Sequence, residues 1–84
     1  MELLFSEKAW EDYLYWHETD KRIARKINEL IKATTRDPFS GIGKSEPLKQ
    51  ALSGYWSRRI TDEHRFVYKV ENGMIKIAQL RYHY

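Results

Sequence analysis

The chain has 84 residues and a net charge of +3, and its three Trp, six Tyr and three Phe must supply much of the core of so small a domain. It contains no cysteine, which excludes a disulfide framework and a thiolate nucleophile, and no apolar run approaches the roughly 18 residues that a membrane span requires. Residues 1–20 hold six acids and one lysine, whereas residues 21–84 hold fourteen bases and six acids, so the basic part could contact phosphate or could simply form solvated helix faces.

The first segment predicts a strand followed by a helix. Met1–Phe5 is too short and too acidic for a signal peptide, and Leu3–Phe5 is typical of a short strand. Ser6 is a good N-cap for a first helix, whose apolar face would be formed by Ala9, Trp10, Tyr13, Leu14 and His17. We therefore expect a cytoplasmic protein in which residues 1–84 form one domain, with no membrane partner.

A second helix should follow directly. Thr19 and Asp20 can cap it, and it should end at Asp37–Pro38 because the residue before a proline avoids helical backbone. One face of this helix carries Ile23, Ile27, Leu30, Ile31 and Thr34, and basic residues cover much of the rest.

The second half of the chain predicts three strands. Ser45–Leu48 looks like the opening of a short third helix, since serine caps well and proline is tolerated in a first turn. Strands are expected at Tyr55–Ile60, Arg65–Val70 and Met74–Tyr82, and Asn72–Gly73 is a strong hairpin signal between the last two. The order βααβββ predicts an α+β fold in which two N-terminal helices cover one face of an antiparallel sheet and leave the other face free for a ligand.

The chain offers the groups needed to cut RNA without a metal or other cofactor. The ribose 2′-OH is the nucleophile, so the protein must supply a base, an acid and cations for the phosphorane. Glu46 is a candidate base, because a helix N-terminus would favour its ionised form, and Lys49 would share its helical face. The alternative, which this spacing alone favours, is a first-turn acid paired with a surface lysine.

His83 is the candidate acid, because imidazole has a reference pKa near 6.5. Arg81, two residues earlier on the same expected strand face, would bind phosphate, and Tyr84 could stack on a base. The alternative is an exposed terminal histidine without a role. The three histidines are scattered and no HExxH motif is present, so the sequence predicts no metal site.

Alternation along the strands separates the arginines. Phe66, Tyr68 and Val70 form an evident core face, which places Arg65 on the open face, where a planar guanidinium is a good phosphate clamp. Arg59 shares its face with Tyr55 and Ser57, whereas Arg58 lies with Trp56 and Ile60. The alternative for Arg65 is an ion pair with Glu63 or Glu71. His64 and the aromatic residues Trp10, Tyr13 and Trp16 are most simply structural.

These motifs resemble the RelE/YoeB family of bacterial toxin endoribonucleases, and its YoeB branch in particular. The resemblance covers nearly the whole chain and is sharpest at Trp10–Tyr13, Lys26–Ile31, Glu46–Lys49, Trp56–Ile60 and Tyr82–Tyr84. It implies a RelE-like, microbial-RNase-like fold.

The activity that this resemblance implies is ribosome-dependent cleavage of mRNA in the A site, with a 2′,3′-cyclic phosphate or 3′-phosphate and a 5′-hydroxyl as products. It makes Glu46 the general base and His83 the general acid, with Arg65 stabilising the transition state and Tyr84 positioning the nucleotide. Lys49 and Arg59 would assist.

The resemblance also implies a cognate antitoxin of the YefM/Phd type and allows a homodimer. Two alternatives remain open at this point. One is a non-catalytic RNA- or ribosome-binding module, because the basic strands are interleaved with Tyr55, Trp56 and Tyr68. The other is a protein whose only partner is its antitoxin.

Overall fold

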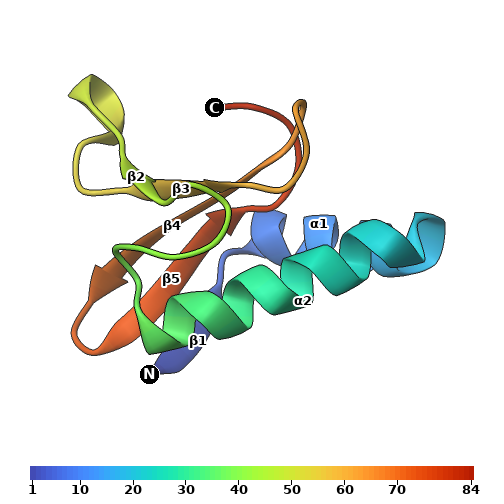
Figure 1. The fold of residues 1–84 in the computed structure, drawn as a ribbon, viewed down its shortest axis with the longest axis horizontal. Coiled ribbons are helices and arrows are strands. Elements are labelled where there is room, and N and C mark those ends of the chain that lie inside the picture. Colours follow the sequence, from blue (N-terminus) through green and yellow to red (C-terminus); the bar gives the residue numbers. More distant parts are fainter.

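The computed structural model describes residues 1–84 and places two helices on one face of a five-stranded sheet (Figure 1). In chain order the elements are β1 (Glu2–Phe5), α1 (Glu7–Thr19), α2 (Lys21–Arg36), β2 (Glu46–Pro47), the 3-10 turn η1 (Gln50–Leu52), β3 (Trp56–Arg59), β4 (Arg65–Glu71) and β5 (Met74–Gln79). The α+β class, the two N-terminal helices and the three later strands are confirmed.

The sheet is mixed, not antiparallel as expected. Its strand order is β1-β5-β4-β3-β2, and β1 pairs with β5 in parallel, whereas the other three pairs are antiparallel. The pairing joins the first strand of the chain to the last. A local sequence pattern carries no information about such a long-range neighbour, which is why the sequence did not predict its direction.

The buried face of α1 differs from the expected one. Ala9, Asp12 and Trp16 are buried, whereas Trp10 and Leu14 expose 48% and 42% of their surface. Asp12 turns inward because its carboxylate accepts a hydrogen bond from a buried backbone amide, a partner that hydrophobic spacing cannot reveal. Apolar periodicity alone therefore misplaced this face.

Helix α2 follows its sequence pattern closely. The Asp20 carboxylate accepts hydrogen bonds from the amides of Arg22 and Ile23 and caps the helix. The helix ends at Arg36, before the Asp37–Pro38 pair, as expected. The residues buried along its inner face are Ala24, Ile27, Leu30, Ile31 and Thr34.

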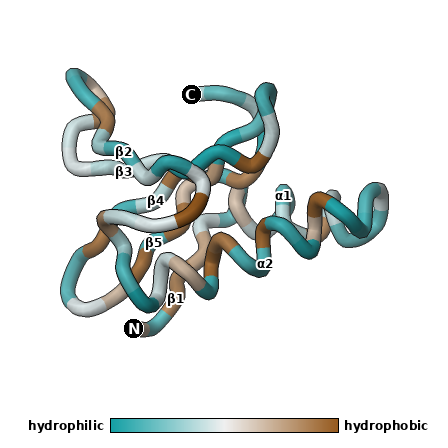
Figure 2. The backbone as a smooth tube through the Cα atoms, viewed as in Figure 1, coloured by the Kyte–Doolittle hydropathy of each residue, from teal (hydrophilic) through white to brown (hydrophobic).

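The core lies between the helices and the sheet. Ile27 and Leu30 of α2 belong to the same cluster as Phe66, Tyr68 and Ile77 of the sheet, all of them fully or almost fully buried. Hydrophobic and hydrophilic segments alternate along α2 in Figure 2, as expected for a helix with one face on the sheet. Neither helix combines the length and hydropathy of a transmembrane segment.

The expected third helix at Ser45–Leu48 is wrong. Glu46 and Pro47 instead form the edge strand β2, which pairs with Ser57 and Trp56 of β3. An edge strand tolerates proline because the missing N–H would point away from the ladder. The helical turn η1 comes later, after Lys49.

A buried arginine organises the loop that leads into β2. The side chain of Arg58 is fully buried and donates hydrogen bonds to three carbonyl oxygens, those of Asp37 (2.6 Å), Ser40 (2.8 Å) and Ile42 (2.8 Å). Its Nε donates to the Tyr68 hydroxyl at 3.3 Å. The pKa of Asp37 is lowered, chiefly because the Ser40 hydroxyl donates to its carboxylate. Arg58 is therefore a scaffold for the loop 37–45 and is not available to a ligand.

Candidate active site

A polar cleft of about 230 Å³ lies where the C-terminal residues meet β3, β4 and the loop before β2. It is lined by Gly43, Lys44, Glu46, Ser57, Arg59, Arg65, His83 and Tyr84. Five of the seven residues that the sequence predicted as site residues are among them, and they come from four separate segments of the chain.

Glu46 reaches the cleft from the edge strand β2, opposite the buried Ser57 of β3. The Tyr84 hydroxyl donates a long hydrogen bond of 3.4 Å to its Oε1, and no cation lies within ion-pair distance of the carboxylate. Because Glu46 is exposed and its Oε2 has no protein partner, this carboxylate can accept a proton from a bound molecule.

Arg65 is anchored by one nitrogen and free at the others. Its Nη1 donates to the carbonyl oxygens of Thr61, Asp62 and His64 in the turn before β4. Nη2 and Nε make no hydrogen bond within the protein, so a planar two-donor edge is left for a ligand. The expected alternative, an ion pair with Glu63 or Glu71, does not form. A tethered guanidinium with a free edge is well suited to hold a phosphate.

Arg59 and Arg65 are direct partners in the β3–β4 register, so both side chains lie on the same face of the sheet. Its guanidinium is 3.9 Å from the carboxylate of Asp62, whose side chain is almost fully exposed. Such a surface ion pair is weak, so Arg59 can exchange it for a phosphate at little cost. The Arg59 amide also donates to the Gly43 carbonyl oxygen at 2.7 Å and ties β3 to the loop that borders the cleft.

His83 and Tyr84 enter the cleft together. Their ring centroids are 4.5 Å apart, and His83 Nδ1 lies 3.3 Å from the Tyr84 carbonyl oxygen. Nε2 of His83 has no partner in the protein and is accessible, since the residue is exposed. This nitrogen can therefore exchange a proton with a molecule in the cleft.

Two predicted site residues lie outside the cleft lining. Lys49 is exposed at the start of η1. Arg81 stacks on the ring of Tyr15 in α1, with 3.6 Å between its guanidinium carbon and the ring centroid. The sequence placed Arg81 and His83 on one strand face, but β5 ends at Gln79, so strand alternation no longer applies there. Contacts of Lys49 and Arg81 with a substrate stay predictions.

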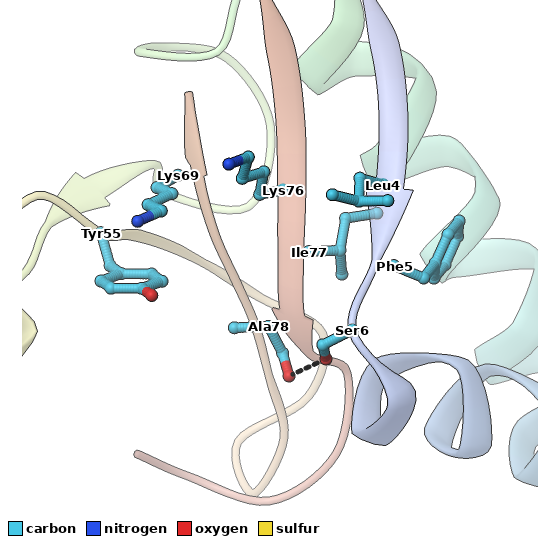
Figure 3. A pocket seen from close by; sticks show the side chains of 8 residues that line it. All are labelled: Leu4, Phe5, Ser6, Tyr55, Lys69, Lys76, Ile77 and Ala78. Carbon is cyan, nitrogen blue, oxygen red and sulfur yellow. Dashed lines mark hydrogen bonds between the residues drawn. The ribbon is translucent and has the colours of Figure 1, made fainter. Parts of the chain in front are cut away.

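A second hollow, of about 280 Å³, lies beside β1, β4 and β5 (Figure 3). Lys69 and Tyr55 form one side, with the ammonium 5.1 Å from the ring centroid, and Leu4 lies on the other side. Lys76 donates to Glu71, and this hydrogen bond is the main reason why the pKa of Glu71 is lowered. No carboxylate or imidazole lines this hollow, so it lacks the combination of acid and base groups that the polar cleft has.

The polar cleft, in contrast, gathers an unpaired carboxylate, an imidazole and two guanidinium groups. These are the groups that general acid–base transfer at a phosphodiester requires. The sequence did not single out Gly43, Lys44 or Ser57, which also line the cleft. Strand alternation had placed Ser57 on the face of Arg59, and no sequence signal marked the other two. No three His, Cys, Asp or Glu side chains are grouped so as to hold a metal ion.

Known proteins resemble the chain over its whole length. The family model of YoeB-like toxins of bacterial type II toxin–antitoxin systems matches residues 5–84. The toxin YoeB of Escherichia coli strain K12 is 66% identical over 84 residues, which are 100% of both chains. The YoeB dimer from Staphylococcus aureus has a TM-score of 0.92 and 50% identity, over 100% of this chain and 98% of that one. In the YoeB–YefM complex from the same species the values are 0.91 and 49%, with the same coverage.

Proposed function

This chain belongs to the YoeB-like toxins of bacterial type II toxin–antitoxin systems, and from that premise we propose that it is a ribosome-dependent endoribonuclease that cleaves mRNA in the A site. Family membership confirms the resemblance that its motifs carried. The single observation that supports the nuclease activity is the polar cleft, in which Glu46, Arg65 and His83 come together from three distant segments.

In the proposed reaction Glu46 removes the proton of the ribose 2′-OH, and the resulting oxyanion attacks the adjacent phosphorus. The free edge of Arg65, assisted by Arg59, stabilises the charge that develops on the phosphorane oxygens. His83 donates a proton to the leaving 5′-oxygen. The products are a 2′,3′-cyclic phosphate, which can be hydrolysed to a 3′-phosphate, and a 5′-hydroxyl, and no cofactor takes part.

Tyr84 has a positioning role in this proposal. Its ring lies against the ring of His83 and its hydroxyl reaches Glu46, so it can orient a base between the acid and the carboxylate. Lys49, outside the cleft lining, would contact the phosphates of neighbouring nucleotides, and Arg81 would have to leave Tyr15 to do so.

The proposed partners follow from the relatives. Structures of relatives from Staphylococcus aureus include a YoeB dimer and a YoeB–YefM complex. We propose that this chain likewise has a cognate YefM/Phd-like antitoxin, a disordered segment of which folds on the toxin, and that it can form a homodimer. Its site of action would be the small subunit of the ribosome in the cytoplasm.

Primer extension on an mRNA in a purified translation reaction tests the activity. Wild-type protein should create new 5′ ends inside A-site codons, and none should form without ribosomes. His83→Ala should lower the cleavage rate by about 10²–10⁴-fold, the usual contribution of a general acid. His17→Ala is the matched control, because the imidazole of His17 lies against Tyr13 of its own helix and outside the cleft. Translation block without new ends would instead support the non-catalytic binding module.

A pH–rate profile tests the role of Glu46. Glu46→Gln keeps the size of the side chain but cannot take up a proton, so the variant should be slow and should lose the acidic limb of the profile. An acidic limb identical to that of the wild type would remove Glu46 from the role of base.

A further inference from the structure

The C-terminal tail, residues 80–84, is held along its length by side chains outside the cleft. After β5 the chain turns back alongside the β3–β4 connection (Figure 1). Two buried residues of α1 fix the start of the tail: the Leu80 amide donates to Asp12 Oδ2 at 3.0 Å, and the indole N–H of Trp16 donates to the Leu80 carbonyl oxygen at 2.9 Å. The tail therefore leaves the sheet from a fixed point.

Tyr82 is the second fixed point, and it has an unfavourable backbone conformation. Its φ of 66° lies in the left-handed region, which a residue with a bulky side chain occupies only when its neighbours hold it there. Its carbonyl oxygen accepts from the Arg65 amide at 3.0 Å. Its amide donates to Nδ1 of His64 at 2.7 Å, a short contact between a backbone donor and an imidazole acceptor.

We propose that His64 is a positioning residue: as a neutral imidazole it accepts the Tyr82 amide, holds the left-handed turn and thereby directs His83 into the cleft. The proposal rests on the nuclease function proposed above. Without the acceptor, the Tyr82 amide would face a group that offers it no hydrogen bond. The turn would then relax toward ordinary backbone angles and move the next residue, His83, away from its working position.

The surroundings of His64 fit this role. Its ring packs edge-on against Trp16, with centroids 4.8 Å apart, and lies 5.8 Å from the Tyr82 ring, so the imidazole plane is fixed from two sides. No side chain of the protein forms a hydrogen bond or ion pair with the ring. In α1, the titratable groups that contact the tail are Lys8, Asp12 and Tyr15. The other titratable groups of α1 are Glu7, Glu11, Tyr13, His17 and Glu18. Asp62, Glu63 and Arg65 lie around the turn of His64 itself, and the tail carries Arg81, Tyr82, His83 and Tyr84.

The contact depends on the protonation state of the ring. When Nδ1 accepts a hydrogen bond, the proton of the neutral imidazole is on Nε2. A second proton converts Nδ1 into a donor that would face another N–H, and the hydrogen bond is lost. Protonation of His64 should therefore loosen the tail.

Gln79 supplies a separate anchor. Its Nε2 donates to the carbonyl oxygens of Arg81 at 3.1 Å and Tyr82 at 3.3 Å. The tail should thus become displaced, not unfolded, when the His64 contact is lost. Substrate affinity should then change less than the rate of the chemical step.

Two replacements of His64 that have nearly the same shape as each other distinguish the loss of the hydrogen-bond acceptor from a change in packing. His64→Asn retains an acceptor oxygen near the position of Nδ1 but cannot be protonated, whereas His64→Leu has a similar shape and no acceptor. In single-turnover cleavage with saturating programmed ribosomes, His64→Leu should be slower than wild type by about 10- to 100-fold, because a small misplacement of a catalytic group has effects of this size. The ribosome concentration at half-saturation should change by a much smaller factor than this rate. His64→Asn should retain most of the activity and should lose less of it on acidification than the wild type.

Equal rates for the Asn and Leu variants would overturn the proposal, because packing alone would then explain both. A raised half-saturation concentration with an unchanged saturating rate would also overturn it, since His64 would then act on binding. If the wild type itself does not cleave, the proposed nuclease function fails, and the following measurement still tests the tail.

NMR gives a readout that needs no activity. Long-range ¹H–¹⁵N spectra should show an unprotonated Nδ1 in His64 at neutral pH, and the Tyr82 amide should exchange slowly with solvent in the wild type and in His64→Asn but fast in His64→Leu. If the Leu variant does not fold, titration of the wild type is decisive: the Tyr82 amide should lose protection as His64 is protonated. If the exchange rate of the Tyr82 amide does not depend on the protonation state of His64, the assignment is overturned.

Discussion

Replacing the buried Arg58 by methionine should destabilise the protein more than any replacement of an exposed arginine. Methionine fills similar space but leaves the carbonyl oxygens of Asp37, Ser40 and Ile42 without their donor. Removal of a buried cation also removes the cost of its desolvation, which by itself would stabilise the protein. The variant is nevertheless less stable because the buried carbonyl groups are left without a donor.

The magnitude follows from these contacts. A hydrogen bond from a charged donor contributes about 1.5–3 kcal/mol, and three short ones would give an upper limit well above 5 kcal/mol. An unpaired buried carbonyl group costs about 1–3 kcal/mol, and the three acceptors lie in the loop 37–45, which can partly turn toward water, so we expect a loss of about 3–5 kcal/mol. Since a domain has a total stability of about 5–15 kcal/mol, this loss would be severe.

Guanidinium unfolding followed by Trp fluorescence provides the assay, and the adjacent Arg59 provides the control. Arg59→Met removes only the surface pair with Asp62 and should cost about 0–1 kcal/mol. Arg58→Lys should be almost as unstable as Arg58→Met, because an ammonium group cannot reproduce the planar fork. Equal unfolding midpoints for the Arg58→Met and Arg59→Met variants would refute this account of the loop. In the cleavage assay, when rates are compared for equal amounts of folded protein, Arg59→Met should be the more defective of the two variants.

Two further predictions concern charge and backbone. The pKa of Glu71 is lowered in the folded protein, chiefly by the hydrogen bond from Lys76, so its stabilisation is present above the ordinary value of 4.5 and is lost as the pH falls. Glu71→Gln should therefore be less stable than wild type at neutral pH, and urea unfolding should show this difference shrink as the pH is lowered below 4.5. Gly43→Ala should lose about 1–3 kcal/mol in the same assay, because φ is +80° and the new Cβ would lie 2.9 Å from Leu30 Cδ2. Gly73→Ala is its control, since it has a similar φ of +73° but open space around the Cβ; equal losses in the two alanine variants would contradict the steric part of this argument.

Local patterns predicted the elements whose contacts are themselves local. The inner face of α2, its Asp20 cap and its end before Pro38 all follow from neighbours within a few residues. The β4–β5 hairpin turns at Asn72 and Gly73, which both have positive φ, as an Asn-Gly turn requires. In these segments propensity and tertiary packing favour the same structure.

Prediction failed where a distant partner overrides a local signal. Ser45 and Pro47 look like a helix start, but pairing with β3 draws Glu46 and Pro47 into a strand. The consequence for the site is direct. Glu46 lies in an edge strand and not next to a helix N-terminus, so the argument from the helix for its ionised form does not apply.

The composition of the cleft was more predictable than its geometry. Chemistry restricts the proposed metal-free cleavage of RNA to a few residue types, so Glu46, Arg65 and His83 could be chosen as candidates without knowledge of the fold, and they all line the cleft. Arg81 could not be placed in the same way, because its assignment required β5 to continue to Tyr82, and the strand ends at Gln79. The chain leaves the sheet there because Asp12 and Trp16 bind both backbone polar groups of the next residue.

Side chains that position a site by binding backbone atoms are therefore the residues that are hardest to predict from the sequence. Asp12, Trp16 and His64 act on the amides and carbonyl groups of the tail, and a backbone partner has no side-chain identity that could mark the pair. If His64 has the proposed role, a relative could keep every acid, base and arginine of the cleft and still cleave slowly when its residue at position 64 offers no acceptor. The Asn and Leu variants of His64 are the direct measure of that difference, because they alter the acceptor while the catalytic groups stay the same.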